Sequence, residues 1–82
     1  MNFKEATDAL FDQVDHSTLA KALGVSVASI RQARLKPSAK AHRAPPKDWP
    51  FAVIRLAEKQ IMANRKLIEE VRREAKVQND GN

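Results

Sequence analysis

The chain has 82 residues, of which 15 are lysine or arginine and 10 are aspartate or glutamate, and its formal net charge is +5. The length fits one domain, and the absence of cysteine excludes disulfides and thiolate metal sites. No apolar run approaches the roughly 20 residues that cross a membrane, and the N-terminal residues lack the pattern of a signal peptide, so we expect a cytoplasmic protein.

The first predicted element is a helix near the N-terminus. Apolar residues at helical spacing form one of its faces, and acidic residues lie on the other. We expect this helix to pack behind the segment that follows, and a partner-binding amphipathic helix is the alternative. The apolar face consists of Phe3, Ala6, Leu10, Phe11 and Val14, and the acidic face of Glu5, Asp8 and Asp12. Residues 15–17 form the predicted break after it.

Two short helices that cross at a tight turn are predicted over residues 16–35. Ala20 is small where the helices must approach most closely, and Gly24 suits the left-handed backbone that ends the first helix. The second helix is expected from about residue 27 to 34 or 35. The inward positions are Leu19, Leu23, Val25, Ile30 and Ala33. The predicted capping residues are Ser17 or Thr18 for the first helix and Ser26 for the second.

This stretch resembles the helix-turn-helix of the lambda-repressor and Cro-like family of phage and bacterial regulators, over about twenty of the 82 residues. The resemblance implies that the start and the outward face of the second helix contact double-stranded DNA. The base-reading residues would be Val27, Ala28, Arg31 and Gln32. Arginine and glutamine can form bidentate contacts with guanine and adenine, and methyl groups suit thymine. An ordinary helix pair in a small bundle is the alternative.

Positive charge is concentrated in the same part of the chain. No acidic residue occurs between Asp15 and Asp48, and seven lysines and arginines lie there. An acid-free segment around a recognition helix is the electrostatic footprint expected for contact with phosphates. The residues predicted to contact the DNA backbone are Thr18, Ser26, Arg34, Lys36, Lys40 and Arg43.

Residues 36–48 form a basic arm that contains three of the four prolines. Pro45 and Pro46 favour a stiff, extended backbone. Such an arm could follow a phosphate strand or enter a minor groove, or it could be a spacer that turns the chain toward the last helix. The sequence leaves both interpretations open.

A long helix is predicted over residues 49–78, followed by a disordered tail at 79–82. Asp48 is a suitable N-cap, and Pro50 lies in the first turn, where its missing N–H costs little. The helix would be about 40 Å long and would project beyond the helices of residues 1–48, which we call the head. Its first turns are apolar nearly all round and are expected to pack in the core through Trp49, Phe51, Ala52, Val53, Ile54, Leu56 and Ala57.

Farther along this helix the apolar residues repeat every seven positions, a pattern typical of a coiled coil. A polar residue in such a seam specifies register and strand number. We therefore expect a homodimer, and Leu67 and Met62 widen the stripe so that parallel, antiparallel and four-helix pairings all stay open. The predicted seam consists of Ile54, Ile61, Asn64, Ile68 and Val71.

Together these patterns predict an all-α protein of about four helices, with a DNA-binding head at residues 1–48 and a dimerising helix at 49–78. The expected function is that of a sequence-specific transcriptional regulator, a dimeric repressor of an inverted repeat. His16 and His42 lack the partners of a catalytic or metal site, so we expect no enzyme activity, metal, cofactor or small-molecule ligand. The alternatives are an architectural or recombination factor on DNA and a helical protein adaptor.

Overall fold

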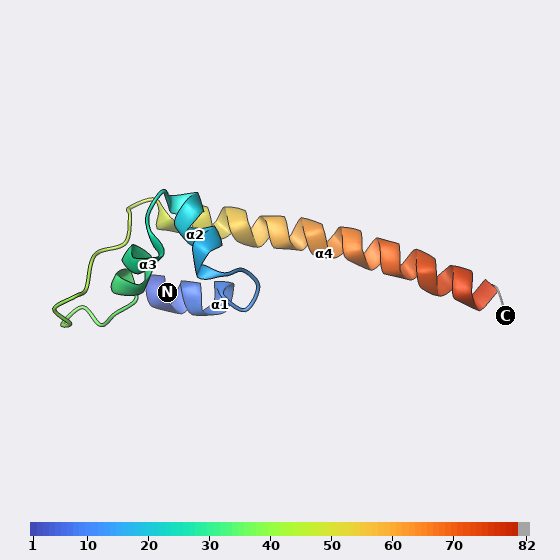
Figure 1. Ribbon diagram of the computed structural model, residues 1–82. Coiled ribbons are helices and arrows are strands. Elements are labelled where there is room, and N and C mark those ends of the chain that lie inside the picture. Colours follow the sequence, from blue (N-terminus) through green and yellow to red (C-terminus); the bar gives the residue numbers. More distant parts are fainter. Residues whose placement is uncertain (81–82) are drawn as a thin grey trace.

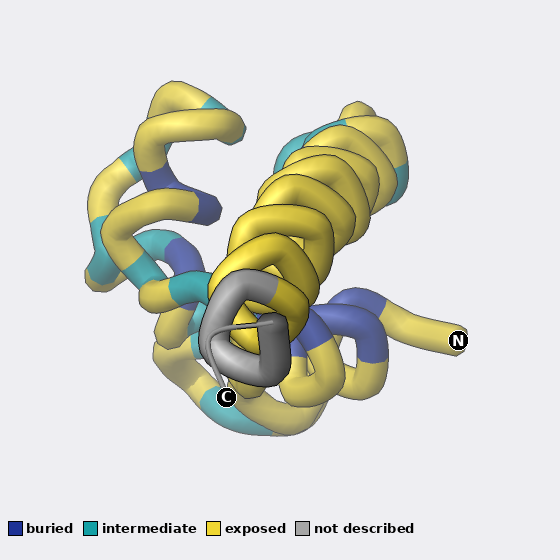
Figure 2. Tube along the Cα trace, turned by 90° about the vertical axis from the view of Figure 1, so that its right-hand side faces the viewer, coloured by how far each residue is buried: buried dark blue, intermediate teal, exposed yellow. Residues whose placement is uncertain are grey.

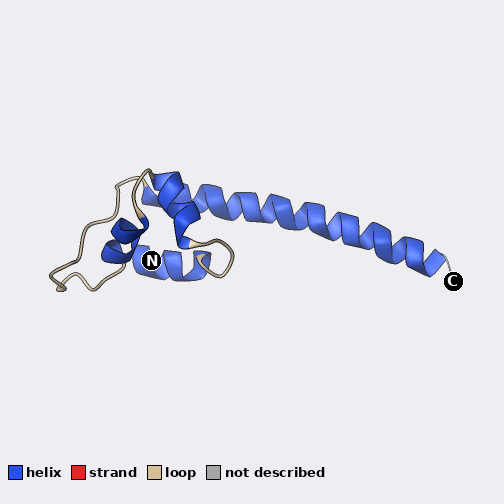
Figure 3. Cartoon of the chain, in the orientation of Figure 1, coloured by secondary structure: helices blue, strands red, loops and turns tan. Residues whose placement is uncertain are grey.

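The computed structural model describes the backbone of residues 1–80 and the side chains of residues 1–76. It contains four helices, α1 (Phe3–Leu10), α2 (His16–Leu23), α3 (Val27–Ala33) and α4 (Trp49–Asp80), and no strand among the described residues (Figures 1 and 3). Helices α1, α2 and α3 gather at the N-terminal end of α4, and the rest of α4 projects from this head. The prediction of an all-helical chain with a long C-terminal helix is confirmed.

Helix α1 begins at a capping box. The Asn2 side chain accepts a hydrogen bond from the Glu5 N–H at 2.8 Å, and the Glu5 carboxylate accepts one from the Asn2 N–H at 3.1 Å. The helix ends at Leu10, earlier than the apolar pattern predicts. The N–H groups of Gln13 and Val14 both donate to the Leu10 carbonyl, at 2.9 and 3.1 Å, and this turn replaces the last helical turn.

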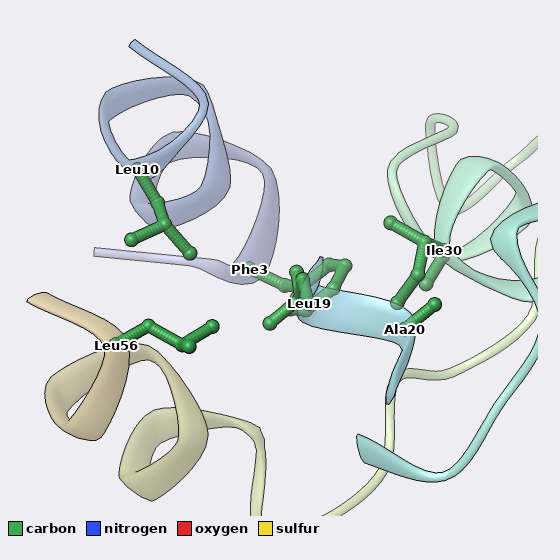
Figure 4. Close-up of a cluster of buried hydrophobic side chains, with 7 residues drawn as sticks. Phe3, Leu10, Leu19, Ala20, Ile30 and Leu56 are labelled. Carbon is green, nitrogen blue, oxygen red and sulfur yellow. The ribbon is translucent and has the colours of Figure 1, made fainter. Parts of the chain in front are cut away.

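Leu19 of α2 and Ile30 of α3 are the most deeply buried large apolar residues, at 0% and 1% exposure. Figure 4 shows Leu19 at the centre of the core, among side chains of all four helices. The Phe3 and Trp49 rings meet edge to face with centroids 5.4 Å apart and tie α1 to the start of α4. The buried apolar residues that form the core are Phe3, Ala6, Leu10, Leu19, Ala20, Ile30, Ala33 and Leu56.

The first turns of α4 are less buried than the sequence predicts. Phe51 is 71% exposed and Ile54 is 52% exposed, so their assignment to the core is wrong. A straight helix presents only one face to the head, and Leu56 is buried on that face while Ala52 and Val53 pack at its border. The apolar composition of residues 49–57 does not indicate which side of α4 faces solvent.

Beyond residue 60, α4 leaves the head. Every described side chain from 61 to 76 is exposed, as the yellow tube in Figure 2 shows. The helix continues to Asp80, two residues past its predicted end and into the predicted tail, and residues 81–82 of that tail lie outside the described residues. Among the described residues, none of the helices is long and apolar enough to cross a membrane.

Candidate nucleic-acid interface

Helices α2 and α3 are joined by a tight turn at residues 24–26. Gly24 has φ 69° and ψ 32°, the left-handed conformation that the sequence predicts for it. The Val25 N–H donates to the Ala20 carbonyl at 3.0 Å, and the Gly24 N–H donates to the Lys21 carbonyl at 3.2 Å. This pair of hydrogen bonds is a Schellman motif, which ends α2 and turns the chain directly into α3.

Ser26 caps α3, as predicted. Its hydroxyl oxygen accepts a hydrogen bond from the Ser29 N–H at 3.1 Å, and the two serine hydroxyls lie 3.0 Å apart. The inner face of α3 is fixed by Ile30 and Ala33, which are buried against the core. The cap and the buried face together hold the opposite face of α3 toward solvent.

The four predicted base-reading residues differ in exposure. Ala28 and Arg31 are exposed on the outer face of α3, and Gln32 is half-buried beside them. Val27 packs partly against the core, so only part of its side chain is available to a ligand. The structure therefore brings Ala28, Arg31 and Gln32 together on one accessible face and leaves Val27 at its border.

The basic arm folds back on the head. The Arg43 N–H donates to the Gln32 carbonyl at 3.3 Å, and turns within residues 36–42 shorten the chain between them. Lys36, Lys40 and Arg43 are all exposed. The arm is consequently more folded than the proline content predicts, and its hydrogen bond to Gln32 holds Arg43 next to the end of α3.

Arg34 is turned inward, contrary to the predicted phosphate contact. Its guanidinium forms an ion pair with Asp8 of α1, lies 4.9 Å from the centre of the Phe11 ring, and approaches Nε2 of His16 at 3.1 Å through Nη1. The Phe11 and His16 rings stack with centroids 3.9 Å apart. Arg34 Nε is buried and meets no acceptor among the described residues. Hydrogen bonds from Lys4 and then Arg34 lower the pKa of Asp8.

Thr18 also forms its hydrogen bonds within the chain, to the residue that caps α2. Asp15, rather than Ser17 or Thr18, is the N-cap of α2, and its Oδ1 accepts hydrogen bonds from the Thr18 N–H at 2.8 Å and the Thr18 hydroxyl at 2.6 Å. The hydroxyl proton is thus directed to Asp15, and a contact between this hydroxyl and a phosphate, which stays a prediction, would have to replace that hydrogen bond. The Thr18 hydroxyl, the Thr18 N–H and the Ser17 hydroxyl lower the pKa of Asp15, in that order of effect.

The contacts of Arg34 and Thr18 differ in how far apart their partners lie in the chain. The interactions of Arg34 join residues 18 and 26 positions apart in the chain. The cluster of Asp8, Phe11, His16 and Arg34 therefore had no local signal, whereas an aspartate directly before a helix is a common cap that could have been recognised.

The comparisons give no external assignment. No family model, curated protein or solved structure matches the chain. Among the described residues, no group of three or more histidine, cysteine, aspartate or glutamate side chains could hold a metal ion. The assignment of the site accordingly depends on the geometry and charge of the head.

The predicted dimerisation residues lie outside the head and share one side of α4. Ile54, Ile61, Ile68 and Val71 are between 47% and 56% exposed, and Asn64 is exposed among them. Large apolar side chains exposed in a row are unusual on a monomer and typical of an interaction surface. This row is separate from the outer face of α3, so both surfaces can be occupied together.

Proposed function

We propose that this chain is a sequence-specific DNA-binding transcriptional regulator of the lambda-repressor and Cro-like kind, with α3 as the recognition helix. The observation that carries the proposal is the outer face of α3 beyond the tight turn at Gly24, where Ala28 and Arg31 are exposed and Gln32 is half-buried beside them. An α-helix fits the major groove of B-DNA, and side chains on its outer face then reach the base edges. Arg31 would read guanine and Gln32 adenine.

The charge of the head supports a nucleic-acid ligand. Residues 16–47 contain seven lysines and arginines and no acidic residue. Arg34 is neutralised by Asp8, and the exposed cations Lys36, Lys40 and Arg43 of the arm that follows α3 are left for phosphate contacts. Phosphate contacts position the protein on DNA, whereas the residues on α3 specify the sequence.

Two copies joined through α4 would present two recognition helices to an inverted repeat, since the symmetry of a protein dimer is mirrored by its operator. A chain with so small a head has little room for an effector pocket, and we therefore favour repression by occupancy of a promoter. The expected location is the cytoplasm, on the nucleoid.

The test is fluorescence anisotropy of the full chain with the duplex upstream of its own gene and with a scrambled duplex of equal length, each at two salt concentrations. A sequence-specific regulator prefers the upstream duplex by about 1000-fold or more, and the preference persists at the higher salt concentration. Equal, salt-sensitive binding to both duplexes would instead indicate an architectural factor or a recombination factor. No binding to either duplex would contradict the proposal and leave the helical adaptor.

A further inference from the structure

The exposed row on α4 also contains information about how two copies would be arranged. The row runs for about five helical turns from Ile54 to Val71, and from residue 61 onward no described side chain of the same chain covers it. We infer that a second copy of the chain covers this row in the antiparallel orientation, with the two heads at opposite ends of the pair. The inference adds a geometry to the dimer in the proposed function and rests on it.

The antiparallel register that uses the whole row pairs large side chains with small or polar ones. Ile54 faces Val71 of the second copy, Ala57 faces Ile68 of the second copy, and Ile61 faces Asn64 of the second copy, and each layer occurs twice. The two Asn64 side chains lie in adjacent layers near the symmetry axis, where their amides can meet. Every residue of the row is then covered.

The surface near Ala57 is hollow where this register places a large side chain. A groove of about 220 Å³ runs between α1 and α4, lined by Ala6, Ala9 and Leu10 on one side and by Val53 and Ala57 on the other. Ile68 of the second copy would lie over this groove. Complementary shape at this point links the pairing of α4 to the packing of the head.

The charges that flank the row also favour this register. Glu58 lies beside Arg72 of the second copy, and this opposite-charge pair occurs twice. Arg65 faces Arg65 of the second copy across the symmetry axis, which is the one like-charge pair that the register creates along the same flank. The two attractive pairs outweigh the single repulsive one, whose long side chains can separate in solvent.

A parallel pair provides neither the alternation of large and small side chains nor the opposite-charge pairs. Ala57 would face Ala57 of the second copy and leave a gap between layers of isoleucine, because identical residues meet in every layer. Along the flanks Glu58 would lie beside Val53 of the second copy, and Arg72 beside Leu67 of the second copy, so no opposite charges meet. The two Asn64 side chains can meet in a parallel pair and in an antiparallel pair, so they do not distinguish the two orientations.

Other antiparallel registers are also poorer. Moving the copies one heptad in one direction leaves Ile68 and Val71 without partners. Moving them one heptad in the other direction places Arg65 beside Arg72 of the second copy twice. The register centred between residues 62 and 63 therefore combines the longest buried row with the best charge pairing.

This arrangement separates the two heads. At 1.5 Å per residue, the two Trp49 residues at the head ends of α4 lie about 40 Å apart along the pair, because each is level with residue 76 of the second copy. In a parallel pair they would lie about 10 Å apart, the distance between neighbouring helix axes. A separation of this size is comparable to the roughly 34 Å between successive major-groove entries on one side of B-DNA.

The orientation can be measured directly because the chain has no cysteine. A Lys76→Cys variant of the full chain, carrying a spin label at this exposed site, is examined by pulsed electron spin resonance without DNA. We expect a distance of about 40 Å between labels in the antiparallel pair, since residue 76 of one copy is level with residue 49 of the other. A distance of about 20 Å or less would overturn the inference in favour of a parallel pair, and a monomer in analytical ultracentrifugation at tens of micromolar would overturn it altogether.

Charge exchange provides a second test that does not depend on a label. Arg72→Glu alone is expected to weaken dimerisation by about tenfold, because it places two carboxylates together twice, and adding Glu58→Arg is expected to restore the affinity. Arg73→Glu is the matched control, since this neighbouring side chain lies on the opposite side of α4 and should change dimerisation less than twofold. A double variant that dimerises as weakly as Arg72→Glu alone would contradict the register.

The same labelled protein is then titrated with the upstream duplex. A distance of about 40 Å in a protein that does not bind DNA would support the pairing and contradict the proposed function. Specific DNA binding by a protein with the shorter distance would support the function and contradict the pairing. The experiment can therefore contradict the antiparallel pairing without contradicting DNA binding, and the reverse.

Discussion

Nη1 of Arg34 lies 3.1 Å from Nε2 of His16, so the residue that ends α3 is fixed to the first residue of α2. The guanidinium donates this hydrogen bond, and the imidazole nitrogen accepts it. With the Asp8 ion pair and the Phe11 ring, the contact holds three segments of the head together. Arg34 is a structural residue within a stretch whose other cations are exposed.

Arg34→Ala is therefore expected to destabilise the head rather than to weaken DNA binding selectively. The lost contact with the Phe11 ring alone should cost about 1 kcal/mol. Arg31→Ala is the matched control, because Arg31 is exposed and should change the free energy of unfolding by less than about 0.5 kcal/mol. Urea unfolding measures both variants. If Arg34→Ala leaves the free energy of unfolding unchanged but weakens DNA binding, the residue contacts phosphate and is not structural.

Gly24→Ala is expected to destabilise the chain by about 1 kcal/mol through backbone strain alone. An added Cβ at residue 24 would meet no atom within 4 Å, so steric overlap makes no contribution. Gly24→Asn should cost less, since asparagine adopts the left-handed conformation more readily than alanine. Thermal unfolding of the three proteins distinguishes the two causes. Equal losses for alanine and asparagine would contradict an origin in the backbone conformation.

Acid is expected to unfold the head through Asp8 and Asp15. The pKa of each carboxyl is lower in the folded chain than its ordinary value, because hydrogen bonds favour the ionised form. Their stabilising contribution is therefore complete above the unfolded pKa of about 4 and is lost as the pH falls through the lower folded pKa. Stability measured from pH 7 to pH 2 should decline below about pH 4.

Asp15→Asn is the control for this pH dependence. Asparagine is also a good N-cap, so α2 should remain intact at neutral pH, but the residue no longer titrates. The decline of stability in acid should be shallower for this variant than for the natural chain. An unchanged pH profile would show that the cap of α2 does not contribute to the acid response.

Gln32→Ala and Lys36→Ala are expected to affect DNA binding in different ways. Loss of a base-reading glutamine should reduce affinity for the preferred duplex by about 1–3 kcal/mol and have little effect on scrambled DNA. Loss of Lys36 should weaken binding to both duplexes and lower the salt dependence of log K by about 1. Anisotropy titrations at several salt concentrations measure both effects. An equal loss on both duplexes for Gln32→Ala would exclude Gln32 as a base reader.

The local features of the head could be predicted from the sequence because each depends on neighbouring residues. Gly24 ends α2, and Ser26 caps α3, as their positions beside the apolar pattern indicate. The end of α1 was predicted too late, since Phe11 and Val14 pack against the core from a turn and so continue the apolar spacing beyond the helix. Burial is therefore not a reliable guide to the end of a helix.

Features that depend on distant contacts could not be predicted. Nothing near Arg34 in the sequence distinguishes it from Arg31, yet one is held by α1 and the other faces solvent. Phe51 likewise belongs to an apolar run, and only the direction of the head relative to α4 determines that it is exposed. A pattern of residue types identifies a face, but the tertiary arrangement decides what that face contacts.

The long unsupported part of α4 makes folding itself depend on concentration. From residue 61 to 76 the helix receives no packing from the described residues of its own chain, and most of the stability of helices in proteins comes from such packing. Without a second copy this part should unwind at its far end, and circular dichroism should show helix content rising as the protein is concentrated. A promoter controlled by such a chain would respond steeply to the number of copies in the cell, because ordering of the helix, assembly and occupancy of two half-sites all depend on that number.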